Sequence, residues 1–135
     1  MAQVLFVCLH NAGRSQMSQA FFETLAGDRD QARSAGTEPA ERIDPNVVTA
    51  MQEKGIDVSR RQPQKLTDDH VSWADLVVTM GCGDACPVIP GKRYLDWDLL
   101  DPGGRDLNEV RKIRDDIEGR IKELVKELDH TAVRR

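Results

Sequence analysis

This 135-residue chain has no long apolar run, no excess of basic residues, few aromatic side chains and few cysteines. No apolar run approaches the ~20 residues of a membrane-spanning helix, so we expect no membrane partner. The formal net charge is −4, which argues against nucleic acid as a partner. The N-terminus lacks a cationic segment followed by a long apolar one. We therefore expect no signal peptide and a cytoplasmic protein.

Only three cysteines are present, and Cys82 and Cys86 lie close together in the stretch GCGDACP. Structural disulfides are rare in the cytosol, where paired cysteines are more often metal-bound or redox-active. Zinc would need two more ligands, but the three histidines are scattered and no second cysteine pair exists. We predict no metal site and no bound cofactor. A structural disulfide and two inert thiols remain alternatives to the redox-active pair that we favour.

The spacing of this cysteine pair sets a geometric condition. A disulfide needs Cα atoms about 4.4–6.8 Å apart. Four extended residues span roughly 13 Å, whereas one helical turn spans ~6 Å. The segment must therefore coil when Cys82 and Cys86 are joined, and we expect residues 81–87 to be mobile, with Gly81 and Gly83 absorbing the change.

Apolar runs alternate with amphipathic segments along the chain, which is typical of an α/β protein. The continuous runs at 4–8 and 74–80 predict buried parallel strands, and we expect shorter strands at 32–37 and 92–96. No repeat or linker divides the chain. We therefore predict a single domain, residues 1–135, with a four-stranded parallel sheet flanked by helices in flavodoxin-like strand order.

The helices are predicted from periodicity and capping residues. In the first, over 15–26, the apolar positions are Met17, Ala20, Phe21 and Leu25, and Gly27 ends the helix. Asp44 and Pro45 begin a second helix that closes on Gly55, and Thr67 caps a short helix that ends at Trp73. A long amphipathic helix begins near 107, and residues 130–135 are expected to fray. Its apolar positions are Val110, Ile113, Ile117, Ile121, Leu124 and Leu128.

The stretch CLHNAGRS has the pattern Cys-x5-Arg-Ser between a predicted strand and a predicted helix. A loop of this kind directs backbone N–H groups at an anion, and the helix N-terminus adds partial positive charge. Arg14 can hold two oxygens of a tetrahedral oxyanion. The same field favours the thiolate form of Cys8, to which Ser15 can donate a hydrogen bond. The predicted oxyanion-binding residues are Leu9, His10, Asn11, Ala12, Gly13, Arg14 and Ser15.

Two residues of this loop suit its tight turn, because Asn11 tolerates a left-handed conformation and Gly13 permits close approach. An ordinary turn after a buried cysteine is the alternative interpretation. If the strand that ends in Cys8 neighbours the one before Cys82, the two strands lie ~4.8 Å apart and both thiols emerge at one edge of the sheet. The three cysteines would then belong to one site.

Five stretches together resemble the low-molecular-weight protein tyrosine phosphatase superfamily across nearly the whole chain. They are VLFVCLHNAGRSQMSQAF, SAGTEP, DPNVVTAMQEKGIDVS, ADLVVTM and LDWDLLDPGG. Within that superfamily, the RSQM segment resembles the arsenate reductases. The resemblance implies the four-stranded parallel fold of these phosphatases.

Attack on an oxyanion also needs an acid to protonate the departing oxygen. Asp101, followed by Pro102, is one candidate, with Asp96 and Asp98 as nearby competitors, and an aspartate before proline is also a common turn signal. The general acid of the superfamily lies in an Asp-Pro pair at this place, which favours Asp101. Phosphatases of the superfamily usually carry aromatic residues after this pair, whereas glycines follow here. Trp97 could border the site, although a core position is its default.

The resemblance also implies an order of events. Cys8 attacks arsenate while Asp101 protonates the leaving oxygen, Cys82 attacks Cys8, and arsenite departs. Cys86 then forms a disulfide with Cys82, which thioredoxin or another dithiol reductant reopens. The better-known members have six residues between the last two cysteines, whereas this chain has three, so either cysteine of the pair is a candidate for the first attack. Phosphate and sulfate are expected to compete with arsenate.

Some of these relatives bind potassium through an acidic residue in the first helix, but Gln19 occupies that place here, so no metal is predicted. Two other functions compete with arsenate reduction. The first is a phosphatase for small phosphoesters or phosphotyrosine, with the dithiol as an oxidation guard. The second is a non-enzymatic redox sensor or oxyanion-binding regulator, against which the intact set of Cys8, Arg14, Ser15 and Asp101 argues.

Overall fold

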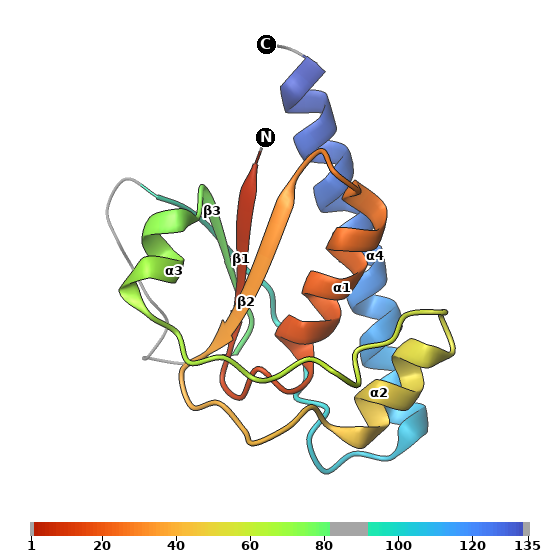
Figure 1. Ribbon diagram of the computed structural model, residues 1–135. Coiled ribbons are helices and arrows are strands. Elements are labelled where there is room, and N and C mark those ends of the chain that lie inside the picture. Colours follow the sequence, from red (N-terminus) through yellow and green to blue (C-terminus); the bar gives the residue numbers. More distant parts are fainter. Residues whose placement is uncertain (1, 82–91, 134–135) are drawn as a thin grey trace.

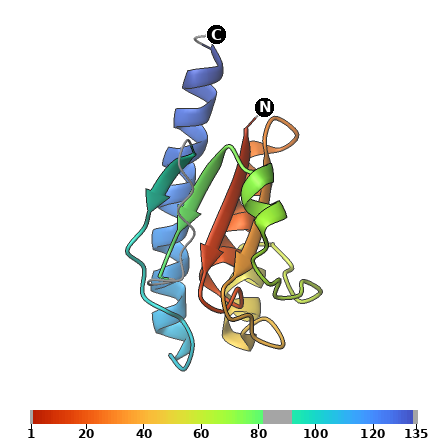
Figure 2. The same ribbon diagram turned by 90° about the vertical axis from the view of Figure 1, so that its left-hand side faces the viewer.

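Four parallel strands form the centre of the molecule, in the order β2-β1-β3-β4 (Figures 1 and 2). The computed structural model describes residues 2–81 and 92–133, the last four by their backbone only. The strands are β1 (Gln3–Cys8), β2 (Gln31–Gly36), β3 (Leu76–Thr79) and β4 (Arg93–Asp96). The predicted four-stranded parallel sheet and its flavodoxin-like order are confirmed.

Side chains of the central strand alternate between two apolar layers, as the two-residue period of a strand requires. Phe6 and Val4 face the larger layer, which also contains Met17, Phe22 and Ile117. The opposite side of β1 packs in a smaller layer against the short helix α3. Figure 1 shows α1, α2 and α4 on one side of the sheet and α3 on the other. Helices therefore cover both faces, as predicted.

The helices are α1 (Arg14–Ala26), α2 (Pro45–Gln52), α3 (Asp68–Trp73) and α4 (Leu107–Val133). Two of the predicted caps are present, because the Asp44 side chain accepts a hydrogen bond from the backbone N–H of Asn46 and the Thr67 side chain accepts one from that of His70. Gly27 ends α1 with a φ of 60°, a left-handed value that suits glycine. None of the described helices is both long and apolar enough to cross a membrane.

Two details of the predicted helices are wrong. The apolar stripe predicted for α1 includes Leu25, but this residue is 36% exposed, because the buried stripe at this end of α1 passes through Phe22 and Ala26. The final helix also continues to Val133 instead of fraying from residue 130. No proline or glycine interrupts it after Gly119, so the helical backbone has no local reason to stop earlier. The predicted mobile segment 81–87 lies largely outside the described residues.

Candidate active site

Cys8 is the last residue of β1, at the edge of the sheet where the parallel strands end. Residues 9–13 connect it to Arg14, the first residue of α1. The neighbouring strand approaches this loop so closely that a Cβ atom on Gly36 would lie 2.8 Å from the Leu9 carbonyl oxygen and 2.9 Å from the Asn11 nitrogen. Ligands bind beyond this edge in parallel sheets, and the fold therefore places the predicted loop where an anion can reach it.

The loop bends at Asn11, which is fully buried and has a φ of 51°. This left-handed conformation is the one expected for Asn11 from the sequence. Its backbone N–H donates to the Cys8 Sγ at 3.2 Å, and its side-chain Nδ2 donates to the Ser15 Oγ at 2.6 Å. Ser15 Oγ in turn lies 2.9 Å from Cys8 Sγ. The sulfur, itself buried, therefore has two polar partners in its own loop.

Arg14 lies at the N-terminus of α1 with only 6% of its side chain exposed. Its Nη1 donates to the backbone oxygen of Leu99 at 3.3 Å, and its Nη2 lies 3.7 Å from the Asp101 Oδ2. Gly13, at the N-cap, has no side chain to occupy the end of the helix. The guanidinium and the helix N-terminus therefore both bring positive charge to the loop.

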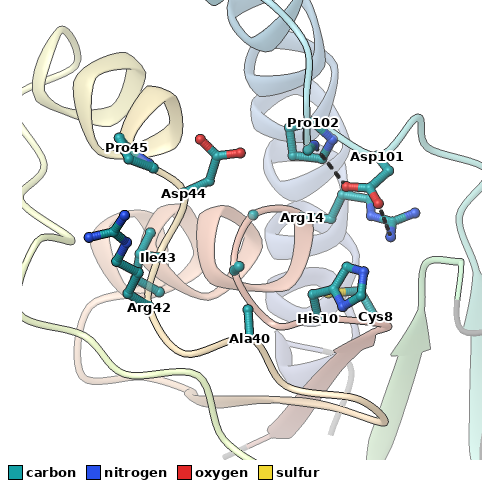
Figure 3. Close-up of a pocket in the computed structure, with 13 residues that line it drawn as sticks. Cys8, His10, Arg14, Ala40, Arg42, Ile43, Asp44, Pro45, Asp101 and Pro102 are labelled. Atoms are coloured by element: carbon teal, nitrogen blue, oxygen red, sulfur yellow. Dashed lines mark hydrogen bonds and ion pairs between the residues drawn. The ribbon is translucent and has the colours of Figure 1, made fainter.

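Asp101 lies across this loop from Cys8 and is 46% exposed. Figure 3 shows its carboxylate directed at the Arg14 guanidinium, while its other oxygen accepts a hydrogen bond from the Gly103 backbone N–H at 2.9 Å. Among the three aspartates considered from the sequence, Asp101 alone lines the cavity above Cys8. Asp96 instead accepts a hydrogen bond from Thr79, and the Asp98 backbone oxygen accepts one from Arg120. The geometry thus favours Asp101 as the acid.

These residues share one cavity of about 300 Å³, shown in Figure 3. Its far wall includes Asp44 and Pro45, which the sequence predicts only as the start of a helix. That wall comes from the segment between β2 and α2, which only the tertiary structure brings to Cys8. The lining residues are Cys8, His10, Ala12, Gly13, Arg14, Ala40, Arg42, Ile43, Asp44, Pro45, Asp101, Pro102 and Gly103.

The remaining predicted site residues divide into three groups. Of the loop residues, His10, Ala12 and Gly13 line the cavity, whereas Leu9, Asn11 and Ser15 do not. Trp97 packs near Phe6 with ring centroids 6.1 Å apart and does not line it. Cys82 and Cys86 lie outside the described residues.

In the described part of the chain, no group of three or more histidine, cysteine, aspartate or glutamate side chains is placed to hold a metal ion. Gln19, at the place of the acidic residue in potassium-binding relatives, has its side chain engaged elsewhere. Its Oε1 accepts from Ser34 at 2.6 Å and its Nε2 donates to the Ala32 backbone oxygen at 3.4 Å.

The fold and the Cys-x5-Arg loop at the end of β1 are those expected of a phosphatase-type protein. The chain matches the model of the low molecular weight phosphotyrosine protein phosphatase family over residues 3–134, and it belongs to this family. It is 41% identical over 129 residues to a putative arsenate reductase of Halobacterium salinarum, covering 92% of this chain and 91% of that protein.

Two solved structures are also similar. The thioredoxin-dependent arsenate reductase of Corynebacterium glutamicum superposes with a TM-score of 0.83 at 44% identity, over 97% of this chain. Our chain spans 63% of that longer chain. The arginine phosphatase YwlE of Geobacillus stearothermophilus superposes with a TM-score of 0.88 at 26% identity, over 100% of this chain and 97% of its own. The fold is therefore shared by reductases and phosphatases.

Proposed function

We propose that this protein reduces arsenate to arsenite and is returned to its reduced state by thioredoxin or another dithiol reductant. The observation that carries the proposal is the grouping of Cys8, Arg14 and Asp101 around one cavity. Similarity to two proteins named as arsenate reductases, at 41% and 44% identity, supports this choice within the family. We further propose that residues 1–135 act as one domain, in the cytoplasm.

Arsenate binding is the first step. The positive charge of Arg14 and of the N-terminus of α1 attracts the dianion, and the backbone N–H groups of the loop hold its oxygens. Phosphate and sulfate have the same tetrahedral shape and compete for this position. The buried guanidinium is already oriented by the Leu99 backbone oxygen, so little side-chain freedom is lost when the anion binds.

Cys8 then attacks arsenic as a thiolate. A sulfur–arsenic bond forms, an arsenic–oxygen bond breaks, and the departing oxygen takes a proton from Asp101 to leave as water. The Asp101 carboxyl lies on the cavity wall near Arg14, as Figure 3 shows. This position supports the proposal that the acid and the nucleophile act on the same anion.

Reduction follows in thiol–disulfide exchange. Cys82, or Cys86, attacks the Cys8 sulfur, so that a disulfide forms, the sulfur–arsenic bond breaks and its electron pair stays on arsenic as arsenite leaves. The third cysteine transfers the disulfide to the pair Cys82–Cys86. The dithiol reductant then reopens it. The family resemblance supplies this order for the two cysteines that lie outside the described residues.

The deciding experiment couples arsenate reduction to NADPH oxidation through thioredoxin and thioredoxin reductase. Wild type should turn over, and Cys8→Ser, Cys82→Ser and Cys86→Ser should each stop steady-state turnover. Binding of phosphate to Cys82→Ser and Cys86→Ser, measured by calorimetry, serves as the control that the anion site is intact. If both variants turn over like wild type, the relay is wrong.

A phosphatase is the second candidate, because the loop and the acid would also serve phosphoester hydrolysis and because the arginine phosphatase shares the fold. Hydrolysis of p-nitrophenyl phosphate is the matching assay. If that substrate is consumed with Cys82→Ser as fast as with wild type, and arsenate is not reduced, the phosphatase function replaces the reductase.

A further inference from the structure

A chain of hydrogen bonds, part-buried at its outer end and buried from Gln16 inward, connects the segment at residues 62–64 to the sulfur of Cys8. Gln16 Nε2 lies 3.4 Å from the Gln62 backbone oxygen and 3.0 Å from Asn11 Oδ1. The Gln64 backbone N–H donates to the same Asn11 oxygen at 2.8 Å. From Asn11 the chain continues through Ser15 Oγ to Cys8 Sγ. Two residues, Asn11 and Ser15, therefore connect Gln16 to the thiol through hydrogen bonds. The sequence alone does not predict this position for Gln16.

The outer end of this chain has a fixed direction, because backbone groups have one role each. The Gln62 carbonyl oxygen can only accept, so Gln16 must present its amide nitrogen to it. The Gln64 backbone N–H can only donate, so Asn11 must present its side-chain oxygen. These two contacts fix which way both side-chain amides face.

The direction of the inner bonds follows from this. With its oxygen held by Gln16 and Gln64, Asn11 turns its Nδ2 toward Ser15 and donates to the hydroxyl oxygen. The Ser15 hydroxyl hydrogen then remains available for Cys8 Sγ, 2.9 Å away. Cys8 consequently accepts two hydrogen bonds, from the Ser15 hydroxyl and from the Asn11 backbone N–H. Two donors directed at sulfur stabilise a thiolate and not a thiol.

The orientation of Gln16 has an energetic cost. Its Oε1 is buried and has no hydrogen-bond partner among the described residues, and an unsatisfied buried acceptor is unfavourable. Turning the amide around would place this oxygen against two acceptors, Asn11 Oδ1 and the Gln62 carbonyl. The observed orientation thus leaves Gln16 Oε1 without a partner among the described residues, while Gln16 Nε2 donates to Asn11 Oδ1. Such an exception in a native site calls for a functional explanation.

We propose that Gln16 is a positioning residue that fixes the direction of the hydrogen bonds to Cys8, acting through Asn11 and Ser15. Its role is to keep the Ser15 hydroxyl donating to the sulfur, so that Cys8 is held as a reactive thiolate. The proposal rests on Cys8 as the nucleophile of the proposed function. The reactivity of the Cys8 thiol tests the role of Gln16 directly. A negative result for Gln16 is therefore distinguishable from a failure of the protein to reduce arsenate.

The test measures the rate of Cys8 alkylation by iodoacetamide as a function of pH, with Cys82 and Cys86 both replaced by serine in every protein. Gln16→Leu removes the donor, and Gln16→Glu puts an acceptor in its place at almost unchanged size. We expect alkylation at pH 7 to be about three- to tenfold slower in both, with the rise of the rate moved to higher pH. The charged or titratable neighbours in the Cys8 cavity (His10, Arg14, Arg42, Asp44 and Asp101) and near Gln16 (Arg33, Arg61 and His70) are unchanged.

The matched control is Gln19→Leu, which removes a glutamine from the same helix whose bonds go to Ser34 and Ala32. Its alkylation profile should equal that of the parent. A double-mutant cycle with Asn11→Ala tests the route: if Gln16 acts through Asn11, adding Gln16→Leu to Asn11→Ala changes the rate no further. Additive effects in the cycle, or wild-type reactivity in Gln16→Glu, would overturn the proposal.

Discussion

The Asp101 carboxylate lies 3.7 Å from the Arg14 guanidinium, joining a half-exposed acid to a buried cation. The two side chains come from segments 87 residues apart in the sequence and meet above the Cys8 loop (Figure 3). Because Cys8, Arg14 and Asp101 line one cavity, a tetrahedral oxyanion bound there would lie between the proposed nucleophile and the proposed acid. The proposed function thus gives Arg14 a role in anion binding and Asp101 a separate role in proton transfer.

Asp101→Asn should therefore separate binding from chemistry. The amide keeps the size and the contact with the Gly103 backbone N–H, but it has no acidic proton to give. We expect kcat for arsenate reduction to fall by about 10²- to 10⁴-fold, while phosphate affinity measured by calorimetry stays the same or rises, because a negative charge next to the anion is lost. A fall in affinity as large as the fall in kcat would mean that Asp101 serves binding instead.

The backbone of Gly81 lies close to the Arg14 guanidinium. Gly81 has a φ of 88°, and a Cβ atom placed on it would overlap the Nη1 of Arg14. Gly81→Ala must therefore displace the guanidinium and also strain the backbone. We expect phosphate affinity to fall about tenfold or more, and the free energy of unfolding to fall by roughly 1–2 kcal/mol. Gly55→Ala is the control, because it has a similar φ of 76° but open space around the site of its Cβ, so it should lose stability without losing anion affinity.

Much of the fold could be predicted because local patterns coincide with tertiary burial. The run Val4 to Cys8 is apolar because both faces of β1 are covered, and Asp44 and Thr67 cap helices through contacts within a few residues. The assignment of Leu25 failed because helical spacing does not say which side of α1 faces α4 and the sheet. The loop from Cys8 to Ser15 could be predicted as a unit because its hydrogen bonds join residues that are close in the sequence.

The parts of the site that depend on segments distant in the sequence were harder to predict from the sequence. Asp101 was chosen over Asp96 and Asp98 only through the family resemblance. Gln16 carried no signal for its role, because its partners at residues 62–64 come close only in the folded chain. Ile43 and Ala40 likewise reach the cavity through the path between β2 and α2.

Gly13 lets the loop that follows Cys8 pack closely against Pro102, the neighbour of Asp101. A Cβ atom on Gly13 would collide with the ring of Pro102, next to Asp101. Because this overlap lies beside Asp101, Gly13→Ala should push the Asp101 segment outward. We expect kcat to fall by about tenfold or more, since small misplacements of a catalytic group are costly, with phosphate affinity little changed. Equal losses in kcat and in affinity would show that the loop itself had moved.

Away from the site, Glu53 joins the end of α2 to α4. Its carboxylate accepts hydrogen bonds from Arg111 Nη2 at 2.6 Å and from Arg114 Nη1 at 2.7 Å. The pKa of Glu53 is lowered from 4.5 to about 2, and the hydrogen bonding from Arg111 is the largest cause. Desolvation, the second-largest contribution, raises the pKa, but the hydrogen bond from Arg114 and the charges of both arginines add to the lowering. The ionised form of Glu53 is thus favoured by folding.

The sign of the pH effect follows from this lowered pKa. Because the folded pKa lies below the unfolded one, the stabilisation is fully present above about pH 4.5 and is lost as the pH falls toward about 2. Glu53→Gln should therefore melt at a lower temperature than wild type at pH 7, and the two melting temperatures should converge as the pH is lowered through this window. Arg111→Leu, which removes the main partner, should show the same convergence. A melting-temperature difference that stays constant from pH 7 to pH 2 in both variants would mean that the arginines stabilise the α2–α4 contact by packing and not by holding the charge of Glu53.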